Sequence, residues 1–283
     1  MSLSQPLVSV CIPVYNGAKY INETLDCVLG QTYKNIELII SDNCSTDNTL
    51  ELIRAYADPR VKIFSNEKNM GIKYNYLKVF TYATGKYLSF MGADDGMELT
   101  TIEKGVAILE SEKYRDVSLV NGYISIINEE SKRVYLKKFI FGGGCFSSYW
   151  GIRSNLLYGS NIIGEPNGAL FKKEAYDKIP EPKFEKGNNW TFDVDMLCEL
   201  LLQGKLYIIP EPLGKFRISA QSTSKKELRF AQARLFREYA MALYRDKRYH
   251  LSFFWVITAS INSFLLEIAR NLFYVFFIKK VKN

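Results

Sequence analysis

The chain has 283 residues with a formal net charge of +7, and 47% of them are hydrophobic. That hydrophobic content is ordinary for a globular protein and excludes a disordered chain, while the positive charge suits an anionic partner such as a nucleotide or phospholipid. His250 is the single histidine. A Ser-His-Asp triad, a Cys-His pair or a His-rich zinc site would have to be built on it, so the chemistry must rest mainly on carboxylates, amides, hydroxyls and basic groups.

The cysteines and the N-terminus indicate the compartment. The five cysteines are odd in number and contain no C-x-x-C pair, which indicates buried thiols in a reducing environment. The N-terminus lacks a basic segment followed by an apolar run, so no secretory signal peptide is expected. We therefore expect a cytoplasmic protein, either free or peripheral on the inner face of the cytoplasmic membrane.

Strands and helices alternate over the first hundred residues. Short apolar, β-branched runs predict strands at residues 7–12, 36–41, 61–65 and 86–91. Helical spacing of apolar residues between these runs predicts connecting helices, the first of which closes near Gly30. This alternation predicts an α/β fold with a mostly parallel sheet and helices on both faces.

Polar clusters follow three of the predicted strands. They are Pro13-Tyr15-Asn16, Asp42-Asn43 and Asp94-Asp95. Ligands of such sheets bind at the carboxyl ends of the strands, so we expect the three clusters to converge on one crevice.

The pattern is less regular after residue 115. Strands are predicted at residues 117–127 and 134–141, a loop with glycine and proline at 162–171, and a helix at 192–203. We expect one catalytic domain over residues 1–222, with a nucleotide-binding half at about 1–115 and an acceptor half at about 116–222. A helical C-terminal extension is expected at residues 223–283.

The pair Asp94-Asp95 offers two carboxylates between Gly92 and Gly96. Hard oxygen ligands on a permissive backbone suit Mg²⁺ or Mn²⁺ bridging to a diphosphate. An Asp-Asp-Gly sequence is also common in solvent-exposed turns, so the pair alone leaves both interpretations open.

Two further acidic segments are candidates. Asp42 ends the second predicted strand and can accept a hydrogen bond from a base or ribose, although residues 42–47 also fit a helix N-cap. Asp193 and Asp195 do not share a helix face, so one can face a cleft as a general base while the other serves the helix N-terminus. Acidic residues in a first helical turn are an equally good explanation of both.

Residues 8–17, Val-Ser-Val-Cys-Ile-Pro-Val-Tyr-Asn-Gly, closely resemble the opening of inverting glycosyltransferases of family 2. Further family-like segments follow in the family's order. They are Ser41 to Asp47, Asn69-Met70-Gly71 with Asn75, Thr84 to Phe90 leading into Asp94-Asp95, and Phe192-Asp193. The resemblance implies the GT-A fold and a sugar transfer from a nucleotide diphosphate, for which we expect UDP.

The resemblance also implies roles for single residues. It places the nucleotide beside Pro13, Tyr15 and Asn16, with Asn75 matching a family asparagine. It places Asp42 at the base and Asp94 at the ribose or sugar. Asp95 becomes the main ligand of a divalent cation, Mn²⁺ or Mg²⁺, and Asp193 becomes the catalytic base. Arg217 is a candidate clamp on the diphosphate, with a surface ion pair as its alternative role.

Four positions depart from the family pattern. Gly92 replaces an aspartate of the metal motif, which leaves the cation to Asp95, the diphosphate and water. Asn43 replaces a second aspartate, Phe192 replaces a glutamate next to the base, and Ser219 stands where a histidine is frequent.

The C-terminal extension carries an uncharged run from Leu251 to Leu266, shorter than the roughly 20 residues that span a bilayer. Residues 251–283 can therefore form an interfacial helix pair on anionic lipid. Helices packed on the catalytic domain or across a homodimer explain the same pattern.

We expect transfer to a saccharide or lipid-linked acceptor in surface polysaccharide biosynthesis. A non-catalytic sugar-nucleotide binder or membrane-attached scaffold is the alternative that the departures at Gly92 and Phe192 keep open. A nucleotidyltransferase is a weaker alternative, because no glycine-rich basic loop follows the first strand. Nucleic acid is not an expected partner, since no recognition motif accompanies the basic residues.

Overall fold

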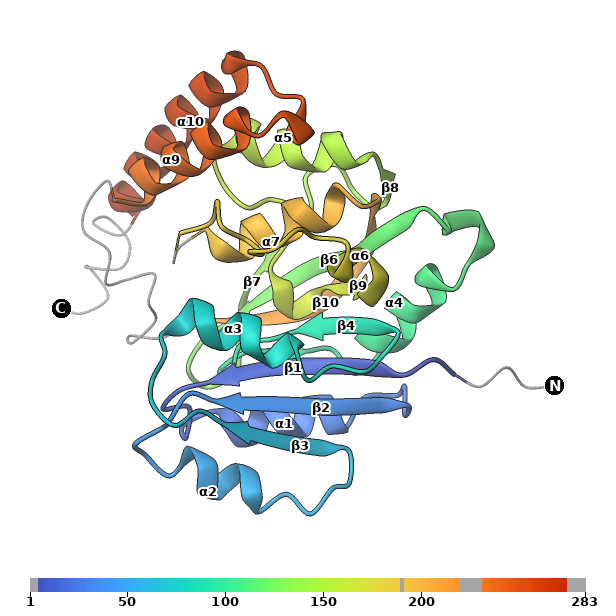
Figure 1. Ribbon diagram of the computed structural model, residues 1–283. Helices are drawn as coiled ribbons and strands as arrows, with labels where there is room; N and C mark the ends of the chain where they lie inside the picture. Colours follow the sequence, from blue (N-terminus) through green and yellow to red (C-terminus); the bar gives the residue numbers. More distant parts are fainter. Residues whose placement is uncertain (1–4, 189–190, 219–230, 274–283) are drawn as a thin grey trace.

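The computed structural model describes residues 5–188, 191–218 and 231–273 (Figure 1). A ten-stranded sheet with the strand order β3-β2-β1-β4-β9-β6-β10-β5 runs through the molecule, with β7 beside β6 and β8 beside β10. Helices pack on both faces of the sheet, which confirms the α/β fold expected from the alternating pattern.

The first half of the sheet is parallel and consists of β1 (Val8–Val14), β2 (Ile36–Asp42), β3 (Val61–Ser65) and β4 (Tyr87–Phe90). The predicted strands at these four places are confirmed. The connecting helices are α1 (Ile21–Leu29), α2 (Thr49–Arg54), α3 (Ile72–Phe80) and, after β5 (Gly96–Met97), α4 (Thr101–Leu109).

Alternation along the strands divides the core into two layers. Val10 and Ile12 of β1 pack with Leu25 of α1 on one face of the sheet, whereas Cys11 packs with Val79 of α3 on the other. Successive side chains of a strand point to opposite faces, so a fully apolar run is required where helices cover both. This is why β1 and β2 read as continuous buried runs.

The second half of the sheet is mixed. It contains β6 (Val117–Ile127), β7 (Arg133–Lys137), β8 (Gly144–Phe146), β9 (Leu170–Lys172) and β10 (Lys205–Arg217). The three-residue β9 is antiparallel to both β4 and β6 and joins the two halves of the sheet, while β10 is parallel to β6.

The strand predicted at residues 134–141 is too long. It ends at Lys137, because the carbonyl of Phe139 accepts a turn hydrogen bond from the N–H of Gly142, whose φ is +74°. The loop predicted at 162–171 also needs correction, since its end belongs to β9.

The remaining helices lie over the second half of the sheet. They are α5 (Ser148–Tyr158), α6 (Lys173–Asp177), α7 (Phe192–Leu201), α9 (Ala231–Arg245) and α10 (Phe253–Phe273), with 3₁₀ turns at Glu112–Tyr114, Pro166–Gly168 and Lys247–Tyr249. The helix predicted at 192–203 therefore exists and ends two residues earlier. Among the described residues, none of the helices has the length and apolar content needed to span a membrane.

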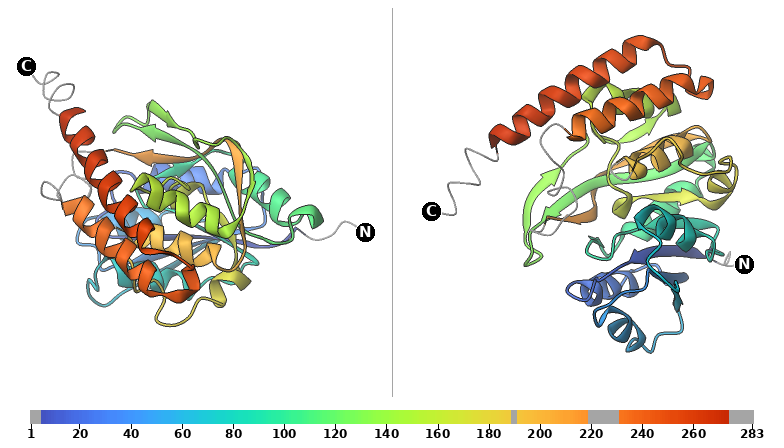
Figure 2. Two further views of the ribbon diagram at one scale, coloured as in Figure 1. Left: turned by 90° about the horizontal axis from the view of Figure 1, so that it is seen from above. Right: turned by 60° about the vertical axis from the view of Figure 1, so that its left-hand side comes forward.

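The C-terminal helices α9 and α10 lie side by side, and α10 packs against α5 (Figure 1, Figure 2). The carboxylate of Glu267, which interrupts the apolar pattern of α10, accepts a 2.8 Å hydrogen bond from the N–H of Ala233 at the start of α9. Glu199 of α7 is buried and binds both Lys186, at 2.8 Å, and Arg248, at 2.9 Å. These contacts connect the C-terminal helices to the helix that carries Asp193.

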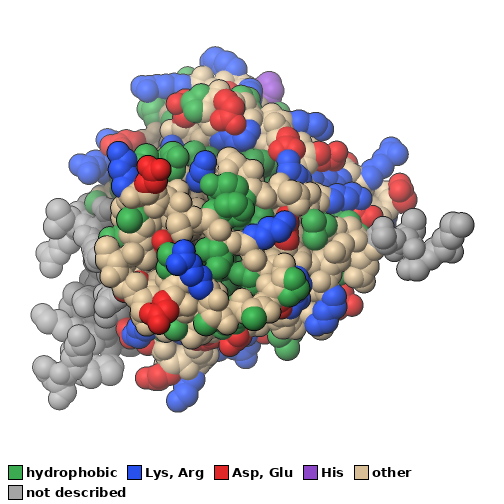
Figure 3. Space-filling model, turned by 60° about the horizontal axis from the view of Figure 1, so that its bottom comes forward, with side chains coloured by type: hydrophobic (Ala, Val, Ile, Leu, Met, Phe, Trp, Pro, Cys, Tyr) green, Lys and Arg blue, Asp and Glu red, His purple; other side chains and the backbone are tan. Residues whose placement is uncertain are grey.

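The face opposite these helices has an ordinary mixed surface. In Figure 3, Lys/Arg and Asp/Glu side chains are interspersed with small hydrophobic areas on this face. Charges of both signs lie close together there, so the visible side chains do not form a field of one sign.

Candidate functional site

A cavity of about 940 Å³ opens at the carboxyl ends of β1 and β4. The first and third polar clusters predicted to converge both line it, and so does Asn43 of the second cluster. From the second half of the chain it is lined by Lys137, Glu165, Asn167, Asp193 and Arg217. The lining also includes Gln232 and Phe236 of α9, so the C-terminal helices form part of its wall.

Asp94 and Asp95 lie in the turn between β4 and β5. The single O–H of Thr24 holds this turn, since it is shared between the carbonyl of Ala93 at 3.0 Å and that of Asp95 at 2.9 Å. Oδ1 of Asp95 accepts a 2.9 Å hydrogen bond from the N–H of Arg217 at the end of β10. The turn is therefore fixed by two neighbouring elements.

The two carboxylates converge over Gly92. A Cβ atom added there would lie 3.0 Å from Oδ2 of Asp95 and 3.1 Å from Oδ1 of Asp94. An aspartate at position 92, as the family motif often has, would crowd both side chains. Because residue 92 is a glycine, the space next to its Cα stays open, and an oxygen of each carboxylate lies beside it.

Burial raises the pKa of Asp95 well above its usual range, and the charge of Asp94 raises it further. Burial also raises the pKa of Asp94. Two such carboxylates resist ionising together unless a cation compensates their charge. Hard oxygen donors of this kind suit Mg²⁺ or Mn²⁺. Among the described residues no cluster of three or more His, Cys, Asp or Glu side chains is present, so the pair fits a cation that completes its coordination with substrate oxygens and water.

Arg217 lines the cavity, but its guanidinium is engaged within the protein. Nε donates to the carbonyl of Asp94 at 2.8 Å and Nη2 forms an ion pair with Glu23 at 2.8 Å. Nη1 donates to the carbonyl of Asn128 at 3.0 Å, and the group lies 4.3 Å from the centroid of the Tyr20 ring. The Arg217 side chain is itself buried, and its ion-pair partner Glu23 is half exposed. These contacts position the Asp94-Asp95 turn, and a bond to a diphosphate would have to replace some of them.

Asp193 lies in the first turn of α7 and lines the cavity. Burial raises the pKa of its carboxyl to about 7, and the charge of Glu165 contributes to the rise. Lys137 opposes that effect and binds Glu165 at 2.7 Å. A carboxylate with a pKa near neutrality is suited to accept a proton from a hydroxyl group.

Asp195 points elsewhere. It is fully buried, and Oδ2 accepts a 2.8 Å hydrogen bond from the N–H of Gly187. It does not line the cavity, whereas Asp193 does. The structure therefore separates the two acidic residues, with Asp193 toward the cavity.

The predicted nucleotide residues divide into two groups. Pro13, Tyr15, Asn16 and Asn75 all line the cavity. Asp42 does not line the cavity. Its carboxylate is buried and accepts a 3.2 Å hydrogen bond from the N–H of Ser45, in the loop that follows β2.

Asn43 and Asn75 also organise the walls. Nδ2 of Asn75 donates to the carbonyl of Ser41 at 2.8 Å, which joins α3 to β2. Oδ1 of Asn43 accepts a 3.0 Å hydrogen bond from the N–H of Met70, and its Nδ2 donates to Oδ1 of Asn69 at 2.9 Å. The amide that replaces the family aspartate can donate and accept at once, and so holds the turn at residues 69–71.

Tyr76 is a cavity residue that the sequence did not predict. Its ring packs 4.5 Å from that of Phe90 and 5.2 Å from that of Phe192, and the side chain lines the cavity. Burial raises the pKa of its phenol, and the charges of Asp193, Asp95 and Asp94 raise it further. Phe192, which replaces the family glutamate, therefore packs against a tyrosine that lies near both acidic groups.

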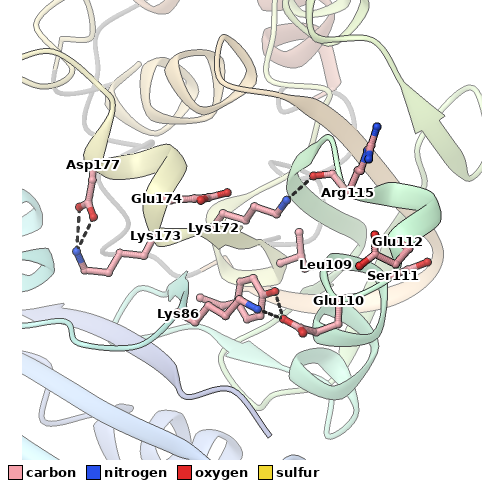
Figure 4. A pocket seen from close by; sticks show the side chains of 11 residues that line it. Lys86, Leu109, Glu110, Ser111, Glu112, Arg115, Lys172, Lys173, Glu174 and Asp177 are labelled. Atoms are coloured by element: carbon pink, nitrogen blue, oxygen red, sulfur yellow. Dashed lines mark hydrogen bonds and ion pairs between the residues drawn. The ribbon is translucent and has the colours of Figure 1, made fainter. Parts of the chain in front are cut away.

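A smaller hollow of about 430 Å³ lies at the opposite end of β4 (Figure 4). Glu110 there binds Lys86 at 2.6 Å and the hydroxyl of Tyr87, and Lys173 pairs with Asp177 at 2.7 Å. These charges already neutralise one another, and none of the predicted site residues lies there. The larger cavity is the candidate active site.

Ser219, the fourth departure from the family pattern, lies outside the described residues.

Known proteins that resemble the chain indicate its family and its fold. An uncharacterized glycosyltransferase of Rickettsia typhi is 30% identical over 226 residues, which are 77% of this chain and 66% of the relative. The chain spans about two thirds of the length of three curated relatives, 66%, 69% and 68%.

Two solved structures share the fold. S. aureus TarS in complex with UDP-GlcNAc superposes with a TM-score of 0.65 at 18% identity, over 95% of this chain and 73% of that one. The mannosyltransferase PcManGT from Pyrobaculum calidifontis, in complex with GDP-Man and Mn²⁺, gives a TM-score of 0.59 at 16% identity, over 98% and 83%. The model of glycosyl transferase family 2 matches residues 9–179. The chain belongs to glycosyl transferase family 2.

Proposed function

We propose that the protein is an inverting, metal-dependent glycosyltransferase that uses a nucleotide-diphosphate sugar. One observation carries this proposal: Asp193 and the Asp94-Asp95 pair line the same cavity. A base for the acceptor and a cation-binding pair for the diphosphate are thus within one site.

We infer that the donor is a UDP-sugar. TarS, which has the same fold, was solved with UDP-GlcNAc, and PcManGT with GDP-Man and Mn²⁺. Pro13, Tyr15 and Asn16 line the cavity at the end of β1, and we place the base and ribose beside them. GDP is the competing nucleotide, because the same fold holds either.

The residues of the chain divide the reaction between them. Asp193 accepts the proton of the acceptor hydroxyl as its oxygen bonds to the anomeric carbon. The bond from that carbon to the diphosphate breaks, and its electron pair leaves on the diphosphate. Attack opposite to the leaving group inverts the anomeric centre. Asp95 and Asp94 would hold the cation, which would stabilise the charge on the diphosphate.

We place the acceptor among saccharides and lipid-linked saccharides, in the biosynthesis of a surface polysaccharide. The acceptor side of the cavity carries Lys137, Glu165 and Asn161, whose charged and amide groups suit sugar hydroxyls. Asn161 and Asn167 each keep a buried side-chain oxygen without a hydrogen-bond partner in the structure. Both oxygens are buried from solvent, so a sugar hydroxyl would reach them only after the surrounding side chains shift.

A thermal-shift screen of UDP-, GDP- and TDP-sugars with and without Mn²⁺ tests the donor. Stabilisation requires preferential binding to the folded state, and we expect it for a UDP-sugar only when the metal is present. Stabilisation by none of the donors would contradict the proposal. Product analysis by NMR then distinguishes inversion from retention at the anomeric carbon.

The non-catalytic alternative is tested separately. An enzyme should hydrolyse its nucleotide sugar slowly without acceptor, and Asp193→Asn should lower that rate while keeping nucleotide binding. A protein that binds the donor with no turnover, in wild type and variant alike, would be a sugar-nucleotide binder.

A further inference from the structure

The outward face of α10 carries a line of exposed hydrophobic side chains. Five of them are 46 to 59% exposed: Phe253, Phe254, Ile257, Ile261 and Leu265. With 3.6 residues per turn, these positions fall within about 120° of the helix circumference. We call this set the α10 stripe. A contiguous exposed apolar area of this kind usually marks an interaction surface.

The direction of the α10 stripe is fixed by packing on the other side of the helix. Nδ2 of Asn262 donates to the carbonyl of Leu157 at the end of α5. A Cβ atom added to Gly159 would lie 2.2 Å from the backbone N of Ser263, so the two backbones are in direct contact. With Glu267 bonded to α9, the helix cannot turn its stripe inward without breaking these contacts.

Cations lie at the amino end of the α10 stripe. The guanidinium of Arg153 is 5.6 Å from the centroid of the Trp255 ring, which packs 5.6 Å from the exposed Phe254. Nζ of Lys247 is 5.9 Å from the Tyr244 ring, and that ring packs 5.6 Å from Phe253. Aromatic rings combined with Lys and Arg are typical of helices that bind an anionic lipid surface.

Two elements that contact α10, namely α5 and α9, lead to or carry residues on the side of the cavity that we assign to the acceptor. Leu157, bonded to α10 through its carbonyl, is itself exposed, and Ser160 and Asn161 line the cavity three and four residues later. On α9, Gln232 and Phe236 line it as well. The helix pair therefore connects the α10 stripe to the acceptor side of the site.

We propose that the α10 stripe docks the protein on an anionic lipid surface, with α10 lying along that surface. A second copy of the chain would bring the same cations toward one another at this face, whereas anionic headgroups complement them. Docking is independent of the glycosyl transfer proposed above. Its consequence for the proposed transfer is that the side of the cavity assigned to the acceptor lies near the lipid.

Sedimentation of the full-length protein with vesicles tests the docking. We expect co-sedimentation with vesicles of phosphatidylcholine and phosphatidylglycerol, and much less with phosphatidylcholine alone. The double variant Ile257→Glu, Ile261→Glu should lower the vesicle-bound fraction about tenfold or more, because it introduces two charges into the face that would lie in the lipid. The double variant Leu99→Glu, Val134→Glu adds the same charge at equally exposed apolar sites and should bind like wild type.

Three outcomes would overturn the proposal. One is no binding of wild type to the anionic vesicles, and another is equal loss in both double variants. The third is a concentration-dependent dimer in analytical ultracentrifugation that the Ile257→Glu, Ile261→Glu variant abolishes, which would assign the stripe to a second copy. Circular dichroism and donor hydrolysis in solution should match wild type in both variants. If the wild-type protein does not hydrolyse the donor, that result counts against the proposed enzyme activity and not against the docking.

Discussion

The backbone N–H of Arg217 donates a 2.9 Å hydrogen bond to Oδ1 of Asp95, while Nε of the same residue donates to the carbonyl of Asp94 at 2.8 Å. One residue at the end of β10 thereby fixes both members of the acidic pair. The pair is positioned by the second half of the sheet although it follows a strand of the first half. We expect this contact to determine how well the site binds a cation and a diphosphate.

Arg217→Gln tests that role. The change removes donors from the buried carbonyls of Asp94 and Asn128, so we expect a loss of about 2–4 kcal/mol in the free energy of unfolding. The ion pair with Glu23 adds little, because Glu23 is half exposed. We also expect KM for the donor to rise more than kcat falls, since the turn is displaced and the base is not. Chemical denaturation and steady-state kinetics measure both. Arg234→Gln, an exposed arginine of α9, is the control and should change neither.

Asp95→Asn should change stability and binding in opposite directions. Burial and the neighbouring Asp94 raise the pKa of Asp95, so the ionised carboxylate is unfavourable in the folded protein without a cation. The amide removes this repulsion and can still accept the N–H of Arg217. We expect a higher melting temperature without metal and a smaller Mn²⁺-dependent shift with UDP-sugar, both measured by thermal shift. An unchanged metal response in the variant would remove Asp95 as the ligand. Asp177→Asn, an exposed acid outside the cavity, is the control.

The pH dependence of transfer tests Asp193 as the base. Burial first and Glu165 second raise the pKa of Asp193 to about 7, and a base acts only when deprotonated. The rate should therefore rise as pH increases through about 7 and level off above it. Asp193→Asn should lower kcat about 100-fold or more and remove this dependence. A wild-type rate that stays flat from pH 5 to about 8 would contradict the assignment.

The same group predicts the sign of a stability change. Since the folded state raises the pKa of Asp193 above the ordinary value of 3.8, folded protein binds the proton more tightly than unfolded protein. The stabilisation from protonated Asp193 is present below that value and is lost as pH rises through about 7. Above that pH, Asp193→Asn should melt at the same temperature as wild type or higher. A variant that loses activity without losing stability separates a catalytic from a structural role.

Local patterns were sufficient for the first half of the fold. The four parallel strands were predicted because β-branched runs buried on both faces are distinct from the helices between them. The long strand β10 was not predicted, because Pro210, Pro212 and Gly214 interrupt its sequence. The structure accommodates them with shifts in the register between β10 and β6. The short β9 depends on partners about fifty residues or more away in the chain, which no local pattern shows.

The site was predictable where chemistry follows a strand end and not where it depends on packing. The motifs and their order along the chain predicted Asp94, Asp95 and Asp193 as site residues, and all three line the cavity. Gln232 and Phe236 reach the cavity only because α9 packs back over the second half of the sheet, and nothing in their own sequence indicates this. Asp42 is the opposite case. It ends a predicted strand, but its carboxylate bonds to the N–H of Ser45 in the following loop and does not line the cavity.

Tyr76→Phe tests a residue that the structure alone suggests. The variant keeps the ring between Phe90 and Phe192, so the free energy of unfolding should change by less than about 1 kcal/mol. It removes a hydroxyl that lies within the electrostatic influence of Asp193 and of both acidic residues of the turn. A hydroxyl there can bond to a donor sugar held between base and cation.

We therefore expect kcat for transfer to fall about tenfold with little change in nucleotide affinity, as for a lost hydrogen bond to a reacting group. Steady-state kinetics with UDP binding by calorimetry measures the two effects separately. Tyr74→Phe lies on the same helix, is largely exposed and does not line the cavity, so it provides the matched control. Equal kinetics for wild type and both variants would leave Tyr76 as a packing residue only, and the ring contacts with Phe192 would then account for its position in full.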